Sequence, residues 1–140
     1  MAKYGSNTVQ ISIDDSGGTA RDLSAHILSI NGVMLEAVME ESHGYNKAWA
    51  EALATGLKRM EPVEVEGLYD DGTNGPHAVL GTLASGPESA TRTITFTWGG
   101  GYATAVEVHI SKYGRVPPRG GITRYRATLT PTGTVTETTP

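Results

Sequence analysis

The sequence contains no cysteine, which excludes disulfide bonds, thiolate nucleophiles and cysteine-based zinc or iron–sulfur sites. It also has no excess of positive charge, because its 140 residues carry a formal net charge of -4 at pH 7. Tight binding to a phosphate backbone needs a basic surface, so a nucleic-acid-binding protein is not expected. No apolar run approaches the ~20 residues of a membrane-spanning helix, and MAKYGSNTVQ has no hydrophobic signal region. We therefore expect a protein made in the cytoplasm.

Glycine, by contrast, is abundant. The chain has 18 glycines and 7 prolines, with 38% hydrophobic and 19% charged residues, a composition typical of a folded, loop-rich β domain. We expect one domain over residues 1–140, a length that buries a core without covalent or metal cross-links. Residues 1–8 and about 131–140 are polar and not needed in a core, so we expect them to form flexible arms.

Alternation of apolar and polar residues, the pattern of a strand with two unlike faces, is the main local signal. It predicts strands at 9–13, 33–41, 63–69, 91–98, 105–113 and 122–130. In the second of these, Leu35, Ala37 and Met39 form an apolar face, which predicts a half-buried strand. Residues 22–30 also favour a strand, although their spacing tolerates a short helix.

Residues 44–60 fit two structures equally. An alanine-rich run with Trp49, Leu53 and Leu57 at helical spacing favours a helix, whereas Gly56 interrupts that pattern and favours an irregular loop. A helix or a loop therefore remains open for this segment.

The stretch VEVEGLYDDGTNGPHAVLGTL, residues 63–83, changes its periodicity halfway. After the alternating strand comes a turn rich in Asp and Gly, in which Thr73 or Asn74 can cap a helix with Pro76 in its first turn. We expect Val79, Leu80 and Leu83 to be buried by this short helix, which would act as a structural plug.

The order of elements is several strands, one short helix and three more strands, without the alternation of a doubly wound parallel sheet. The predicted fold is mainly β: an antiparallel β-sandwich or partly closed barrel with one short α-helix packed against it.

The residues that could bind a metal or take part in catalysis form no recognisable site. The four histidines show no metal-binding spacing, and the adjacent carboxylates Glu40–Glu41 and Asp70–Asp71 are typical of solvated faces or turns. Gly99–Gly101 lacks the Lys-Ser/Thr ending and following helix of a phosphate loop, and predicts a hairpin turn. We therefore predict no catalytic, cofactor or metal site, and no enzyme activity.

The order of these motifs resembles that of the major tail proteins of long-tailed bacteriophages, the subunits of the tail tube. The resemblance rests on the start MAKYGSN, the Asp-Asp-Ser-Gly-Gly turn at 14–18, Arg-Asp-Leu-Ser at 21–24, and GLYDDGTNGPHAVLG at 67–81. It covers residues 1–113. One departure is segment 42–57, which is richer in alanine than the loop that such subunits carry there.

The resemblance implies a subunit of hexameric rings that stack into the tail tube, in the virion, without membrane insertion. The implied partners are other copies of the chain, the tape measure, the terminator and the tail tip, while DNA passes through without specific binding. Acidic strand faces suit such a duct, because they repel phosphates. The pairs Glu36 with Glu40 and Glu64 with Glu66 are the candidates for the lumen, although an ordinary solvated face explains them equally well.

Two other classes remain open. A monomeric carbohydrate-binding β-sandwich would display Trp49 and Trp98 on a flat face, although the register of Trp98 with Ile94 and Phe96 favours burial. Among phage structural proteins, a tail terminator, a tail-completion protein or a head decoration protein has similar size and composition.

Overall fold

The computed structural model describes residues 5, 8–42, 44–45, 48–85 and 91–140. Strands dominate these residues, and the only α-helix among them is short. None of the described helices is long and apolar enough to cross a membrane. The elements are β1 (Gln10–Asp14), β2 (Ala20–Asp22), η2 (Ser24–His26), β3 (Ser29–Asn31), β4 (Leu35–Ser42), β5 (Glu51–Met60), β6 (Val63–Leu68), α1 (Pro76–Leu80), η3 (Gly81–Ser85), β7 (Arg92–Gly99), β8 (Tyr102–Val116) and β9 (Arg124–Thr138).

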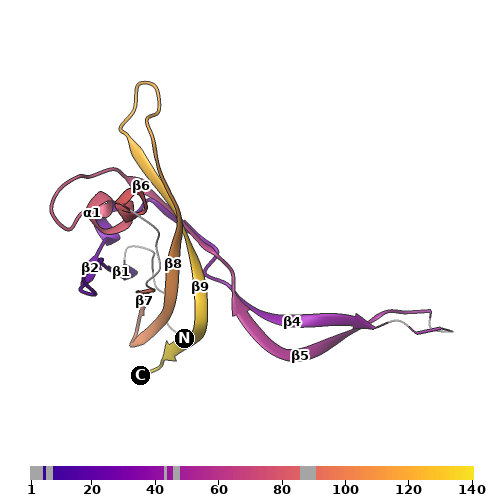
Figure 1. The fold of residues 1–140 in the computed structure, drawn as a ribbon. Helices are drawn as coiled ribbons and strands as arrows, with labels where there is room; N and C mark the ends of the chain where they lie inside the picture. Colours follow the sequence, from indigo (N-terminus) through magenta and orange to yellow (C-terminus); the bar gives the residue numbers. More distant parts are fainter. Residues whose placement is uncertain (1–4, 6–7, 43, 46–47, 86–90) are drawn as a thin grey trace.

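Seven strands form one antiparallel sheet in the order β2-β1-β7-β8-β9-β6-β3. The sheet curls around the core, and α1 lies against it at the end of the molecule away from β4 and β5 (Figure 1). The predicted mainly-β fold with one packed helix is therefore confirmed. Of the two architectures left open, the single curled sheet corresponds to the partly closed barrel.

The core is built by strict alternation on the central strands. In β6 and in residues 124–129 of β9 every second side chain is buried, and the intervening ones face away from the core. Phe96 and Tyr125 are the largest of the fully buried side chains. The strands predicted at 63–69, 91–98 and 105–113, and the glycine turn at 99–101, are confirmed. The remaining fully buried side chains are Ile13, Leu23, Val63, Val65, Val79, Leu80, Ile94, Val108, Ile110 and Leu129.

Among the described residues, strands β4 and β5 pair only with each other, and they project from the body as a long arm (Figure 1). The prediction of a helix or loop at 44–60 is wrong for most of that segment, since residues 51–60 form β5. Helix propensity is a weak preference, and seven residue pairs between β5 and β4 override it. Gly56, with φ of +84°, lies in the bulge that shifts the register.

Two other boundaries differ from the sequence prediction. Residues 22–30 are not one strand, because a 3-10 turn at 24–26 separates β2 from β3. The segment expected as a C-terminal arm continues β9 as far as Thr138, and it pairs with β8 from Thr132 to Thr138. Of the N-terminal arm expected at 1–8, only Gly5 and Thr8 lie among the described residues.

The α1 helix closes one side of the curled sheet, as predicted. Val79 and Leu80 are 1% and 0% exposed, and Leu83 packs partly buried against the same core. The predicted cap is wrong: Gly75 occupies the N-cap without a side-chain hydrogen bond, although Pro76 begins the helix as expected. The turn that Asn74 makes with φ of +62° brings Gly75 to that position.

Arg92 of β7 fastens this helix to the sheet, a role the sequence did not reveal. Arg92 is 4% exposed, and its guanidinium donates hydrogen bonds to the carbonyl of Val79, to Thr82 Oγ1 at 2.7 Å and to the carbonyl of Asp14 at 3.4 Å. A buried cation is tolerated only when such acceptors surround it. Arg92 thus joins the helix end to β1 and β7.

Candidate assembly site

The candidate functional sites of this molecule are exposed surfaces, not a pocket lined by catalytic or metal-binding groups. Within the described ranges, no group of three or more His, Asp or Glu residues is placed to hold a metal ion. The two tryptophans do not share a flat face: Trp49 belongs to the connection at the end of the arm, whereas Trp98 stacks on buried Phe96 with ring centroids 5.5 Å apart. The arrangement of exposed side chains therefore carries the functional argument.

The arm exposes most of the large apolar side chains that remain outside the core. Trp49 is 85% exposed and Leu57 is 65% exposed. Soluble monomers rarely leave apolar side chains in such density, and larger exposed patches mark interaction surfaces. The exposed set on the arm is Met34, Leu35, Met39, Tyr45, Trp49, Leu53 and Leu57.

The apolar face predicted for residues 33–41 exists, but it is not half-buried. Leu35, Ala37 and Met39 all point to one side of β4, and all three are exposed. The alternation in β4 is the same as in β6, and only its position beyond the main sheet leaves this face uncovered. Met39 stands opposite Ala54, a small residue, so the apolar surface continues onto β5.

Polar contacts hold the arm in shape on its opposite side. Arg59 Nε donates to Glu36 Oε2 at 2.9 Å, and this interaction lowers the pKa of the Glu36 carboxyl from its ordinary value. Thr55 Oγ1 donates to the carbonyl of Val38 at 2.8 Å, across the bulge. The arm is thus a paired, internally hydrogen-bonded element that presents its apolar side chains to solvent.

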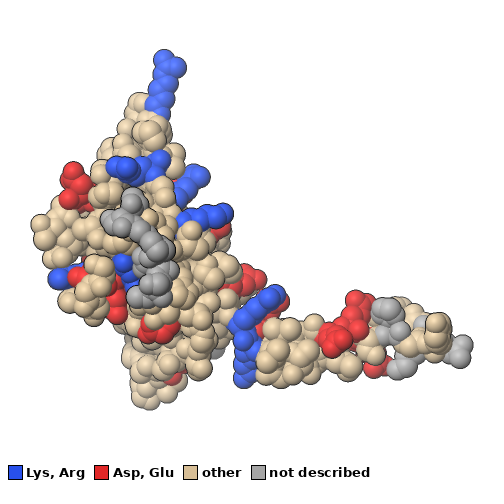
Figure 2. Space-filling view, viewed as in Figure 1, with Lys and Arg blue, Asp and Glu red and all other residues tan. Residues whose placement is uncertain are grey.

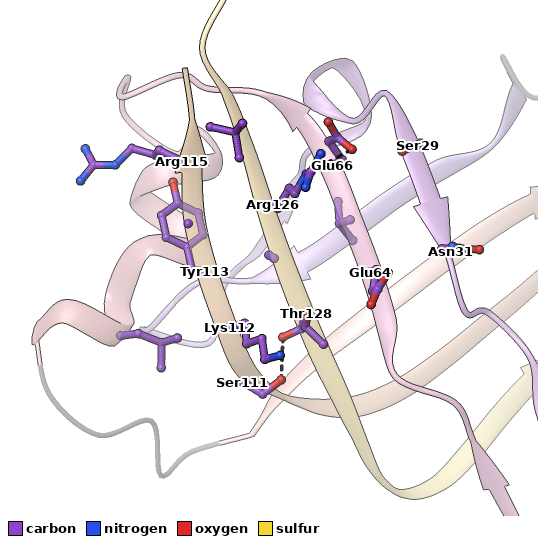
Figure 3. Close-up of a pocket in the computed structure, with 15 residues that line it drawn as sticks. Ser29, Asn31, Glu64, Glu66, Ser111, Lys112, Tyr113, Arg115, Arg126 and Thr128 are labelled. Atoms are coloured by element: carbon purple, nitrogen blue, oxygen red, sulfur yellow. Dashed lines mark hydrogen bonds and ion pairs between the residues drawn. The ribbon is translucent and has the colours of Figure 1, made fainter. Parts of the chain in front are cut away.

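A second candidate surface is the side of the main sheet that faces away from the core, across β3, β6, β9 and β8. Register places Glu64 beside Thr128 and Glu66 beside Arg126, in rows that cross the strands (Figure 3). Glu66 lies 3.5 Å from Arg126 Nε and 3.7 Å from Arg124 Nη1. Because these arginines stand among the glutamates, the rows are mixed in charge rather than purely acidic. A groove of about 810 Å³ crosses them.

The four glutamates proposed for the lumen from sequence are only partly brought together. Glu36 and Glu64 line one groove of about 440 Å³ with Glu61, at the junction of the arm and β6. Glu66 lies two residues farther along β6, whereas Glu40 lies along the arm opposite Leu53. The arginine partners of Glu36 and Glu66 were missed, because only the register of β4 with β5 and of β6 with β9 reveals them.

A third surface is the outer edge of β9. Residues 124–129 pair with β6 on this side, but within the described part of the chain no strand pairs there with residues 131–138. A groove of about 740 Å³ separates this edge from the base of the arm, with Leu35, Leu57 and Val135 among its lining residues. An unpaired edge beside apolar side chains is a template for another strand.

The comparisons with known proteins concern the whole of this architecture. No protein-family model and no curated protein sequence matches the chain. The solved structures that match include the tail of an empty gene transfer agent particle with C6 symmetry, at TM-score 0.76 and 11% identity, over 98% of this chain and 100% of that chain. The chain has the tail tube fold.

Two further solved structures share this fold. The SPP1 tail tube matches at TM-score 0.67 and 12% identity over 99% of this chain and 80% of that chain. A tube terminating cap of the anti-feeding prophage matches at TM-score 0.68 and 10% identity over 100% and 93%. At these identities the likeness establishes the fold alone. The recognition of a tail tube protein from the order of turns and the single helix is confirmed at that level.

Proposed function

We propose that this protein is a structural subunit of a phage-type virion, whose rings stack into the tail tube through which DNA is ejected. The observation that carries the proposal is the β4–β5 arm: a well-paired hairpin on a tail tube fold, with seven large apolar side chains left in solvent. Such side chains are stabilising only when a neighbouring copy covers them, at about 25 cal/mol per Å² of apolar surface removed from water. The role is structural, not enzymatic.

Ring closure is proposed at the outer edge of β9. Residues 131–138 offer unpaired backbone groups on one side, next to the groove at the arm base. A strand from a neighbouring copy that adds there would satisfy those groups and extend the sheet around a ring. The C6 symmetry of the gene transfer agent tail supports a hexamer. The same edge is the natural position for the N-terminal residues of a neighbour.

The lumen is proposed on the side of the main sheet that faces away from the core. Short hydroxyl side chains dominate it on β7 and β9, including Thr93, Thr95 and Thr130, and they offer no strong grip on a nucleic acid. Glu64 and Glu66 lie on this side together with Arg124 and Arg126, so a ring would present carboxylates and guanidinium groups side by side around the duct. Glu66 partly offsets the charge of the two arginines, which weakens the attraction of this wall for passing phosphates.

The proposed partners follow from this role. Rings stack on copies of the same chain, the tape measure lies inside the tube, and a terminator and a tail tip close its ends, with DNA passing without specific binding. The protein would be made in the host bacterial cytoplasm and reside in the phage tail. One observation favours a second candidate: the likeness to a tube terminating cap supports a terminator, which forms a ring without elongating.

Negative-stain electron microscopy of the purified protein tests the proposal. We expect rings or tubes from the native chain, and their loss when Leu35→Asp and Leu57→Asp make the arm polar. Thr73→Asp, on the exposed turn before α1, is the matched control that should assemble normally. Single rings that never elongate would favour the terminator. A strictly monomeric native protein at high concentration, even with tail-initiating partners supplied, would exclude both and favour a monomeric binding module.

A further inference from the structure

The β8–β9 hairpin gathers the positive charge of this acidic protein. Five of its eleven Lys and Arg residues lie between 112 and 126, and no Asp or Glu occurs between Glu107 and Glu137. Figure 2 shows these side chains along the hairpin that rises from the body. We name residues 112–126 the basic hairpin; its cations are Lys112, Arg115, Arg119, Arg124 and Arg126.

Contacts among the residues that the structure describes leave much of this charge uncompensated. Glu66 serves both Arg124 and Arg126, one carboxylate for two guanidinium groups. Arg115 lies over the ring of Tyr69, with its guanidinium carbon 5.6 Å from the ring centroid, so its contact there is with an uncharged group. At the tip, Arg119 is exposed beside Ile122, which is 68% exposed. The tip thus presents one cation and one apolar side chain together.

The outer part of the β4–β5 arm has the complementary chemistry. Glu40 and Glu41 lie there, both exposed, and Figure 2 shows acidic side chains on this part of the arm, beyond the basic residues at its base. We name these two residues the acidic arm end. Exposed Met39 and Leu53 alternate with them along the strands. Both projections therefore combine charge with uncovered apolar surface.

The two projections cannot meet within one chain. The arm and the basic hairpin leave the body in different directions, and their ends are far apart (Figure 1). The basic hairpin of one copy can, however, contact the acidic arm end of another copy. Such a head-to-tail contact either closes a ring or repeats along an axis. The occupant of the basic hairpin is then another copy of this chain.

We propose that the basic hairpin of one copy docks on the acidic arm end of a neighbouring copy, so that charge selects the register between subunits. This inference rests on the proposed tube assembly and specifies the contact that orients it. The proposal predicts that association weakens with salt, because the Debye screening length between exposed charges falls from about 10 Å at 0.1 M salt to about 3 Å at 1 M.

Pairwise cross-linking tests the contact directly, because the native chain has no cysteine. Copies carrying Arg119→Cys are mixed with copies carrying Glu41→Cys and oxidised at about 0.1 M and about 1 M salt, the two screening regimes. At the lower salt, we expect the mixed disulfide dimer of Arg119→Cys with Glu41→Cys to form at least tenfold faster than that of Arg119→Cys with Asp71→Cys. Asp71 is the control, an exposed acidic position away from the arm. Equal rates for Glu41→Cys and Asp71→Cys would overturn the proposal.

Charge reversal provides the second measurement. Lys112→Glu with Arg119→Glu, or Glu40→Lys with Glu41→Lys, should each raise the concentration needed for association at least tenfold, with unfolding temperature unchanged. All four substitutions together should restore association, whereas Asp71→Lys with Thr73→Lys, on the exposed turn before α1, should leave it unaffected. Failure of the fourfold variant to restore association would contradict the pairing.

Binding of a short DNA duplex tests the alternative that the basic hairpin contacts nucleic acid instead of another copy of the chain. If the native protein binds the duplex through Lys112 and Arg119 while both reversed pairs still associate normally, the basic hairpin is a nucleic-acid contact and the proposal is wrong. The proposed function is tested separately, since native tubes with normally assembling reversed pairs would refute this inference alone. Absence of native tubes would refute the tube instead.

Discussion

Replacement of Leu80 by alanine tests whether α1 stabilises the core of its own subunit or forms part of an interface with a neighbouring subunit. Leu80 is the last residue of α1 and is fully buried in the core cluster with Val79. Its side chain therefore contacts the interior of the curled sheet, and no neighbouring subunit is needed to cover it. If this is so, the substitution lowers the stability of the isolated subunit, whatever its state of assembly.

The magnitude follows from burial. Full burial of a leucine side chain contributes about 1.5–3 kcal/mol, and its truncation to alanine in a core costs about 2–5 kcal/mol because a cavity remains. The five-residue helix permits some collapse around the cavity, so we expect a loss of about 3 kcal/mol. For a domain of this length each kcal/mol lowers Tm by about 3 °C, which predicts a decrease of about 10 °C.

Thermal and urea unfolding of Leu80→Ala, followed by circular dichroism, provide the measurement. The matched control is Leu57→Ala, the same chemical change at a side chain that is 65% exposed on the arm. We expect the control to stay within about 0.5 kcal/mol of the native protein, while its assembly weakens. Unchanged stability of Leu80→Ala together with failed assembly would show that the helix belongs to a subunit interface, and would refute the reasoning.

Three further predictions address the fastening of the helix, the core tyrosine and the lumen. Arg92→Met should cost about 1–3 kcal/mol in urea unfolding, because carbonyl groups of α1 and β1 lose their buried donor; a midpoint equal to the native one would contradict this role. Tyr125→Phe should cost about 1 kcal/mol at neutral pH by removing the 3.0 Å hydrogen bond to the His26 carbonyl. Burial raises the pKa of Tyr125, so the native protein loses stability as pH rises above about 10, the pKa of an unfolded tyrosine, and the phenylalanine variant should lose less; identical alkaline unfolding curves would refute it. Glu64→Lys with Glu66→Lys should permit tubes by microscopy but retard genome ejection in a salt-sensitive manner, and normal ejection would contradict the lumen assignment.

The elements predicted correctly from the sequence are those fixed by local rules. In residues 63–83, alternation specifies β6, the turn rich in Asp and Gly ends it, and Pro76 begins the helix that buries Val79 and Leu80. The cap was wrong because Asn74 and Gly75 both permit a turn there, and only the backbone path selects between them. Local signals thus located the helix within a few residues but not its cap.

The features that the sequence did not reveal depend on partners distant in the chain. Residues 51–60 form a strand because β4 pairs with them, and no property of their own composition requires it. Glu66 meets two arginines about sixty residues away through the register of β6 with β9. Arg92 is buried because backbone carbonyls of α1 and β1 converge on it. Register and burial of this kind require the assembled sheet.

The arm illustrates how one local pattern serves two purposes. Leu35, Ala37 and Met39 alternate with polar residues just as Val63 and Val65 do, so the sequence assigns both sets to a buried face. In the single chain, Val63 and Val65 are 0% and 1% exposed, whereas Leu35 and Met39 are 57% and 56% exposed. The pattern therefore predicts the apolar face correctly, but its expected burial within the single chain is wrong. These side chains gain the hydrophobic contribution only when something covers them, so the proposed association would bury the face that the alternation specifies.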